Sequence, residues 1–149
     1  MTGGGRFQLV IDGANPDLLA RFWVAALGYE LQPPPEGFAS RDGYWRDVGR
    51  PEEDLGIGED RIIDPGGSGP RIWSQVVPER KTIKNRIHLD IHASGGRDVP
   101  LSIRREQVDA EVRRLTGLGA TTVRVLQEDG IDHYAVAMTD PEGNEFDVD

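Results

Sequence analysis

Three side chains that could do chemistry alternate along one short stretch of the chain. His88, Asp90 and His92 are each separated by one apolar residue. Side chains of an extended strand point to opposite faces in turn, so this spacing predicts a β-strand over residues 85–93 with two imidazoles and a carboxylate on one face. Imidazole and carboxylate groups are common general bases and metal ligands. We therefore expect the polar face of this strand to look into a polar cavity or into solvent.

A similar stretch occurs 80 residues earlier in the chain. Residues 6–12 align without a gap with residues 86–92, and this alignment places Gln8 opposite His88. The apolar positions of the two stretches also match. The same kind of strand is therefore expected twice.

A second pair of matching segments supports a repeat. An Asp-Pro-Gly-Gly segment begins at Asp64, and an Asp-Pro-Glu-Gly segment begins at Asp140, 76 residues later. Two matches at nearly equal offsets indicate that one module of about half the chain occurs twice. We expect a single domain built from two modules, at about residues 6–78 and 85–149.

Each module is predicted to contain a strand, a helix and three further strands. Asn15 can cap a helix that starts at Pro16 and ends before Gly28, and the second helix is expected over residues 104–118. The segment 36–59 is expected to be a loop with either a short helix or an irregular strand. The remaining strands are predicted over residues 29–32, 61–64, 70–77, 121–127, 134–139 and 145–148. This order predicts an α+β fold, in which two βαβββ modules form a curved mixed β-sheet around a cup with the helices outside.

The composition narrows the classes of partner. The chain of 149 residues carries a net charge of −9, which opposes binding to nucleic acid or to an anionic membrane surface and suits a cationic guest. It has no cysteine, and its sequence shows no long apolar run and no export signal. We therefore expect a cytoplasmic protein.

Several short motifs together resemble those of the vicinal oxygen chelate superfamily, which includes glyoxalases, bleomycin-resistance proteins and extradiol dioxygenases. The resemblance covers nearly the whole chain and is greatest to the glyoxalase-like branch. It implies the two-module fold described above and a homodimer. The motifs are Phe22-Trp23, Leu27-Gly28-Tyr29, Lys84-Asn85-Arg86-Ile87-His88-Leu89-Asp90, Val108-Asp109-Ala110-Glu111-Val112, Leu118-Gly119-Ala120 and Asp140-Pro141-Glu142-Gly143-Asn144-Glu145-Phe146.

In metal-using members of the superfamily, a divalent ion is bound by the first and last strands of each module. Carried over by position, the resemblance implies Gln8, His88 and Asp147 as ligands of Fe, Mn, Ni, Co or Zn. Asp147 stands where those members usually have glutamate. In the last strand of the first module the equivalent position is not fixed by the sequence, and of its candidates only Gln75 could act as a ligand. The chain could therefore also contain no metal.

Two functions remain open from the sequence. The first is a metal-assisted lyase, isomerase or dioxygenase, in which Asp90 or Glu145 would be the catalytic base near the metal. The second is a metal-free protein that binds a drug or metabolite, as the bleomycin-resistance members do. In either case Trp45, Trp73 and His92 are candidate substrate-binding residues, although the two tryptophans could equally close the open side of the sheet.

Overall fold

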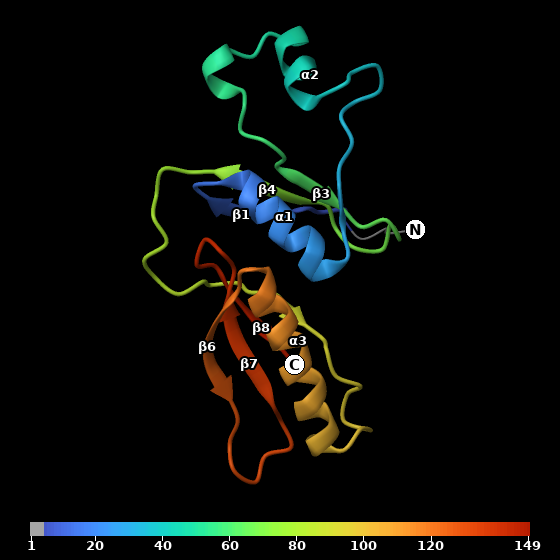
Figure 1. The fold of residues 1–149 in the computed structure, drawn as a ribbon, viewed down its shortest axis with the longest axis vertical. Coiled ribbons are helices and arrows are strands. Elements are labelled where there is room, and N and C mark those ends of the chain that lie inside the picture. The colour runs from blue at the N-terminus through green and yellow to red at the C-terminus, as the bar shows by residue number, and fades with distance from the viewer. Residues whose placement is uncertain (1–4) are drawn as a thin grey trace. The chain divides into compact units, whose positions relative to one another are not determined.

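The computed structural model describes residues 5–149, and within it the chain divides into two compact units (Figure 1). Unit 1 extends to Arg80, and unit 2 comprises Lys81–Asp149. Each unit has its own sheet and its own helix covering that sheet, so each is described by itself.

Unit 1 contains a four-stranded mixed sheet with strand order β1-β4-β3-β2. Strands β1 and β4 are parallel, and the other neighbours are antiparallel. Helix α1 packs on one face of this sheet (Figure 1). The face that carries Val10, which is 44% exposed, and its ladder partner Trp73 is called the open face. The elements are β1 (Leu9–Gly13), α1 (Pro16–Leu27), β2 (Glu30–Leu31), β3 (Arg61–Ile63) and β4 (Ile72–Val76).

Helix α1 begins and ends where the sequence predicted. The Asn15 side chain accepts a hydrogen bond from the backbone N–H of Leu18 at 3.1 Å, and Pro16 occupies the first helical position. Gly28 ends the helix in the left-handed conformation, with φ of 69°, which a residue without Cβ adopts at little cost. The apolar face of α1 supplies much of the core of unit 1, through Leu19, Ala20, Phe22, Trp23 and Ala26.

The segment between β2 and β3 contains helical turns, one of the two possibilities left by the sequence. Helix α2 spans Arg41–Asp47, and a short 3-10 helix spans Glu52–Asp54. The Ser40 side chain caps α2 by accepting a hydrogen bond from the backbone N–H of Gly43 at 3.1 Å. Neither helix contributes a buried residue, which explains why the segment shows no apolar periodicity.

Unit 2 repeats the architecture of unit 1. Its strand order is β5-β8-β7-β6, with β5 parallel to β8 and the other neighbours antiparallel. The core lies between α3 and the sheet, and Val108, Leu115, Phe146 and Val148 are fully buried there. The elements are β5 (Asp90–Ile91), α3 (Leu101–Leu118), β6 (Thr121–Leu126), β7 (Ala135–Thr139) and β8 (Glu145–Val148). The predicted α+β class with two βαβββ modules is confirmed.

Two predicted boundaries in unit 2 were wrong. The strand expected over residues 85–93 is limited to Asp90–Ile91, and Ile87 is 82% exposed instead of packed under a helix. The partner strand β8 starts only at Glu145, so the chain before Leu89 has no ladder to join. The helix expected from residue 104 begins at Leu101, directly after Pro100, because proline is favoured at a helix start but not inside a helix.

The two Asp-Pro turns noticed in the sequence are built in the same way. The Asp64 carboxylate accepts hydrogen bonds from three backbone N–H groups within residues 66–69. The Asp140 carboxylate accepts them from two backbone N–H groups within residues 142–144. Each aspartate closes its own turn, so the repeated motif has the same structural role in both units.

Among the helices within residues 5–149, none combines the length and the apolar character needed to cross a membrane.

Candidate functional site

Three of the ionisable side chains singled out in the sequence converge in unit 2. Asp90 on β5 and Asp147 on β8 are paired neighbours in the parallel ladder, and His88 lies two residues before Asp90. The Nδ1 atom of His88 is 2.9 Å from Oδ1 of Asp90 and 4.0 Å from Oδ2 of Asp147. One potential ligand atom from each of the three residues lies within 4.8 Å of the other two. We call this group the His88 cluster.

The donor set of the His88 cluster fits a divalent transition metal. One nitrogen and two carboxylate oxygens are ligands that Zn, Fe, Mn, Co and Ni accept. Two atoms bound to one tetrahedral ion at about 2.1 Å would be about 3.4 Å apart. The 2.9 Å separation between His88 and Asp90 is shorter than this, and the 4.0 Å separation between His88 and Asp147 is longer. A rotation of the Asp147 side chain would bring its carboxylate to the distance of a third ligand. The side chains of His88 and Asp147 are 34% and 23% exposed, which leaves room for water or substrate.

Glu145 lies on the same face of β8 but is held by other groups. Its carboxylate accepts a hydrogen bond from Nζ of Lys81 at 3.0 Å and another from the backbone N–H of Asn85 at 2.9 Å. Burial raises the pKa of Glu145, but these hydrogen bonds outweigh burial and leave the pKa below its ordinary value. The contacts give Glu145 the role of attaching the segment before His88 to β8.

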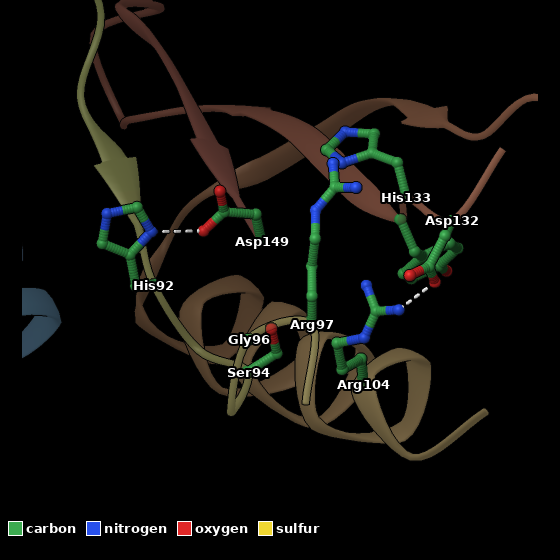
Figure 2. Close-up of a pocket in the computed structure, with 9 residues that line it drawn as sticks. His92, Ser94, Gly96, Arg97, Arg104, Asp132, His133 and Asp149 are labelled. Atoms are coloured by element: carbon green, nitrogen blue, oxygen red, sulfur yellow. Dashed lines mark hydrogen bonds and ion pairs between the residues drawn. The ribbon is translucent and has the colours of Figure 1, made fainter. Parts of the chain in front are cut away.

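His92 and Asp149 continue the polar face of β5 and β8 beyond the His88 cluster. Nδ1 of His92 lies 2.6 Å from Oδ1 of Asp149, and this hydrogen bond raises the pKa of His92. Both residues line a pocket of about 280 Å³ (Figure 2). The predicted substrate-binding residue His92 therefore does line a cavity, although its side chain is 78% exposed.

The charges around this pocket are only partly paired. Arg104 is 6% exposed and forms an ion pair with Asp132, as His92 does with Asp149 (Figure 2). Within residues 5–149, the side chains of Arg97 and His133 have no hydrogen bond or ion pair. The pocket can therefore offer one arginine and one histidine to a guest. No pattern in the sequence marks either residue as part of a pocket, because only the fold brings the 94–99 and 131–134 loops together.

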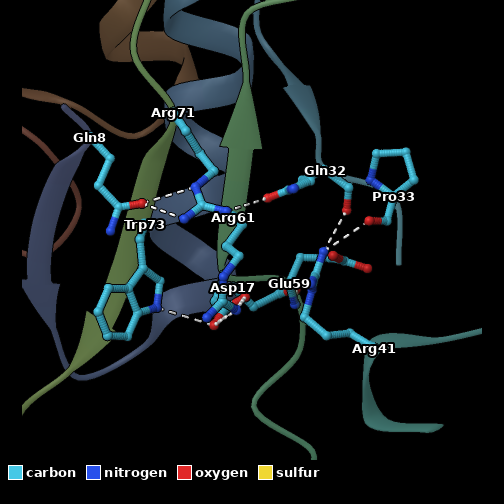
Figure 3. A network of polar contacts seen from close by, with 10 residues as sticks. Gln8, Asp17, Gln32, Pro33, Arg41, Glu59, Arg61, Arg71 and Trp73 are labelled. Carbon is cyan, nitrogen blue, oxygen red and sulfur yellow. Dashed lines mark hydrogen bonds and ion pairs between the residues drawn. The ribbon is translucent and has the colours of Figure 1, made fainter. Parts of the chain in front are cut away.

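In unit 1, Gln8 contacts an arginine. Its Oε1 atom accepts hydrogen bonds from Nε and Nη2 of Arg71 at 2.9 and 2.7 Å (Figure 3). Because this amide oxygen is already occupied by a guanidinium, a metal ion would have to displace Arg71 to reach it. The role of Gln8 as a metal ligand stays a prediction.

The strand pairing identifies the position that the sequence left open in the first module. In unit 2, Asp90 pairs with Asp147, and 80 residues earlier Val10 pairs with Trp73 in the same parallel arrangement. Trp73 is therefore the structural equivalent of Asp147, and Gln75, the candidate from the sequence, is not. Unit 1 offers no carboxylate at this place.

The two tryptophans that are candidate substrate-binding residues, Trp45 and Trp73, both lie close to an arginine, and their role in binding stays a prediction. The guanidinium of Arg61 lies 5.6 Å from the ring centre of Trp45 and 5.4 Å from that of Trp73. The Nε1–H of Trp73 donates a hydrogen bond to Asp60 at 3.3 Å, and Asp60 also pairs with Arg61 at 2.7 Å. These contacts fix both rings at the open face of the unit 1 sheet.

Comparison with known proteins places this fold in a family. Residues 8–148 match the glyoxalase-like domain family, so the chain belongs to it, within the vicinal oxygen chelate superfamily. No curated protein matches the sequence significantly.

Solved structures share the fold at low sequence identity. A glyoxalase/bleomycin resistance protein/dioxygenase family enzyme from Burkholderia phytofirmans PsJN is 16% identical with a TM-score of 0.57, covering 95% of this chain and 94% of that one. The fosfomycin resistance protein FosX from Mesorhizobium loti is 10% identical with a TM-score of 0.55, covering 99% and 92%. A variant of FosX from Listeria monocytogenes, in complex with Mn(II) and 1S,2S-dihydroxypropylphosphonic acid, is 11% identical with a TM-score of 0.58, covering 99% and 90%.

Proposed function

We propose that this protein is a divalent-metal-dependent enzyme that acts on a small molecule, as a lyase, isomerase or dioxygenase. The observation that carries this proposal is the His88 cluster, in which one potential ligand atom from each of His88, Asp90 and Asp147 lies within 4.8 Å of the others. The Mn(II) complex of the Listeria FosX variant supports it, because that protein shares the fold. The metal, when bound, would polarise an oxygen of the substrate and stabilise a developing negative charge.

The residues of the cluster take distinct roles in this proposal. His88 and Asp147 are ligands from neighbouring strands. In this proposal Asp90, which the sequence suggested as a base, is the third ligand, because its carboxylate lies within 4.8 Å of the potential ligand atoms of His88 and Asp147. Glu145 holds the segment before His88 in place through Lys81 and Asn85.

Metal content tests the proposal directly. Untagged protein purified without chelators, and titrated with Mn, Fe, Co, Ni and Zn, should bind about one equivalent of one of these ions. His88→Ala should lose that metal, and His133→Ala should keep it, because His133 lies outside the cluster. Absence of stoichiometric metal under every condition would overturn the proposal.

A second function, metal-free binding of a drug or metabolite, is favoured by the 280 Å³ pocket with Arg97 and His133 facing a possible guest. Chelator-treated protein would then show a rise in melting temperature with members of a small-molecule panel. Arg97→Ala should remove that rise, whereas Arg113→Ala, an exposed position on α3, should not. No rise with any compound would exclude this function for the compounds of the panel.

We also propose that the protein is a homodimer. The edge strand β6 supports this, because Val123 and Val125 on it are 55% and 52% exposed, and exposed apolar edges tend to pair. Light scattering should give a mass of about twice 16.4 kDa. A mass of one chain at micromolar concentration would contradict the dimer.

A further inference from the structure

Unit 1 carries a cluster of arginines on a protein that is acidic as a whole. Arg41, Arg61 and Arg71 surround Gln32 and Trp73 at the open face of the sheet (Figure 3). Arg41 donates to the backbone oxygen of Gln32 at 3.1 Å, and Arg71 approaches its side-chain oxygen at 3.5 Å. One residue therefore connects two guanidinium groups, in a chain whose net charge is −9.

The partners of these arginines are unequal. Arg61 is neutralised by Asp60 at 2.7 Å. Arg41 and Arg71 bind only neutral oxygens, namely the carbonyls of Gln32 and Pro33 and the amides of Gln8 and Gln32. Within residues 5–149, no carboxylate oxygen lies within 4.0 Å of either guanidinium. Two positive charges on this face thus have no direct counter-charge.

Leaving these charges without a direct partner has an energetic cost. Burial lowers the pKa of Arg41, and the nearby Arg61 lowers it further, while Asp60 and Glu59 oppose the effect. Near Arg41 there are three guanidinium groups and only two carboxylates, so the local charge is positive. An anion placed between Arg41 and Arg71 would offset both repulsion and desolvation.

The geometry of Arg71 suits such a guest. Its Nε and Nη2 atoms both donate to the single Oε1 atom of Gln8, and the same two donors can bind two oxygens of a carboxylate or phosphate. A neutral amide is a weaker partner for this fork than an oxyanion and would be displaced by one. Gln8 and Gln32 would then remain as hydrogen-bond donors through their amide nitrogens.

We propose that the open face of the unit 1 sheet is an anion-binding site, at which Arg41 and Arg71 hold the carboxylate or phosphoryl group of a small molecule. The site lies wholly within unit 1 and does not depend on the metal centre proposed for unit 2. It also changes the expected guest, since the net charge alone favoured a cation.

Indole NMR signals provide the test. The chain has three tryptophans, and Trp73 on β4 lies two residues after Arg71, whereas Trp23 is buried in the core and serves as an internal reference. Acetate and inorganic phosphate are titrated separately at constant ionic strength, with acetamide as the neutral control. A saturable shift of the Trp73 signal with either anion supports the site, and the anion that binds more tightly identifies a carboxylate or phosphoryl guest.

Substitutions test whether the anion binds specifically at Arg41 and Arg71 or is only attracted by positive charge on the surface. Arg71→Gln and Arg41→Gln should each weaken anion binding about tenfold or more, because each removes one charged fork. Arg46→Gln, on exposed α2 and paired with Glu52, should change nothing. An unchanged Trp23 signal shows that a variant is folded, and Arg71→Lys supplies a folded replacement if Arg71→Gln is not. No saturable shift, or equal binding by wild type and both glutamine variants, would overturn the proposal.

Discussion

At the scale of single residues, the reach of Asp147 limits the proposed metal centre. Its Oδ2 is 4.0 Å from Nδ1 of His88, farther than two ligands of one tetrahedral ion usually lie. Asp147→Glu adds one methylene and should tighten metal binding about tenfold, whereas Asp147→Asn should weaken it by at least about tenfold because the charge is lost. Calorimetric titration with the preferred metal measures both. Weaker binding in Asp147→Glu than in Asp147→Asn would show that this side chain is not a ligand.

The His92–Asp149 pair predicts a pH effect. The hydrogen bond to Asp149 raises the pKa of His92 above its ordinary value, so the folded state binds the proton more tightly than the unfolded state. The stabilisation is fully present below about pH 6.5, the ordinary histidine value, and is lost as pH rises through the raised value.

An NMR titration of the His92 ring protons tests this effect. Asp149→Asn should return the pKa of His92 toward the ordinary value, and His133 provides a second imidazole in the same spectrum for comparison. Because His92 is 78% exposed, solvent screens the pair and the change in global stability should be small. An unchanged pKa in Asp149→Asn would assign the shift to another group.

Alternation along the sequence identified His88, Asp90 and His92 as candidates for one polar face, although of the three only Asp90 lies within strand β5. What it could not supply was the partner of each side chain. The contact of Arg71 with Gln8, and the position of Arg61 near Trp45 and Trp73, depend on the fold, which joins residues far apart in the chain. The composition gives the number of arginines but not their positions in the structure. The arginine cluster could therefore not be predicted from the sequence.

At the scale of elements, local signals located both ends of α1. Asn15 was predicted to cap α1 and does so through Leu18. Asn15→Ala should lower the free energy of unfolding by about 1 kcal/mol, because a backbone N–H at the helix start loses its acceptor. Urea unfolding followed by circular dichroism measures this change, and Asn15→Asp, which keeps an acceptor, should stay close to wild type. Equal loss in both variants would mean that the effect comes from another contact of Asn15.

The strand around His88 was predicted too long because a strand forms only where a partner strand lies beside it. Periodicity reports which side chains could share a face, but a strand also needs a partner, and β8 reaches only as far as Glu145. Beyond that point, the Glu145 carboxylate replaces the ladder by holding Lys81 and Asn85. The Asn85 side chain also donates to the backbone oxygen of Glu145 at 3.3 Å, so contacts with Glu145 order the segment before His88.

Glu145→Gln tests this attachment. The amide can still accept from Asn85 but loses its charge, so unfolding should become easier by about 1 kcal/mol. Amide exchange of residues 81–88 should rise more than that of β7. In the wild type, the ionised Glu145 carboxylate contributes to the free energy of unfolding. This contribution is fully present above the ordinary glutamate pKa and is lost as pH falls through the lowered pKa of Glu145. Glu106→Gln, exposed on α3, is the control, and the same exchange pattern in both variants would contradict the attachment.

At the scale of the whole molecule, the two units share one architecture but differ in their polar residues. Every member of the His88 cluster belongs to unit 2. Gln8→Ala in unit 1 should therefore change metal affinity less than about twofold, since its oxygen is engaged by Arg71. Metal titration measures this directly. A loss of tenfold or more would establish Gln8 as a ligand and require Arg71 to move aside.

The parallel pairing of the first and last strands in each unit has an evolutionary consequence. It places two chain positions far apart in sequence, Asp90 and Asp147 in one copy and Val10 and Trp73 in the other, side by side without help from any other element. After duplication, each copy could change this pair independently while the scaffold stayed intact. One copy could keep an acidic pair suited to cations while the other acquired arginines suited to anions. Duplication would thus have allowed the two copies to acquire ligands of opposite charge on one scaffold.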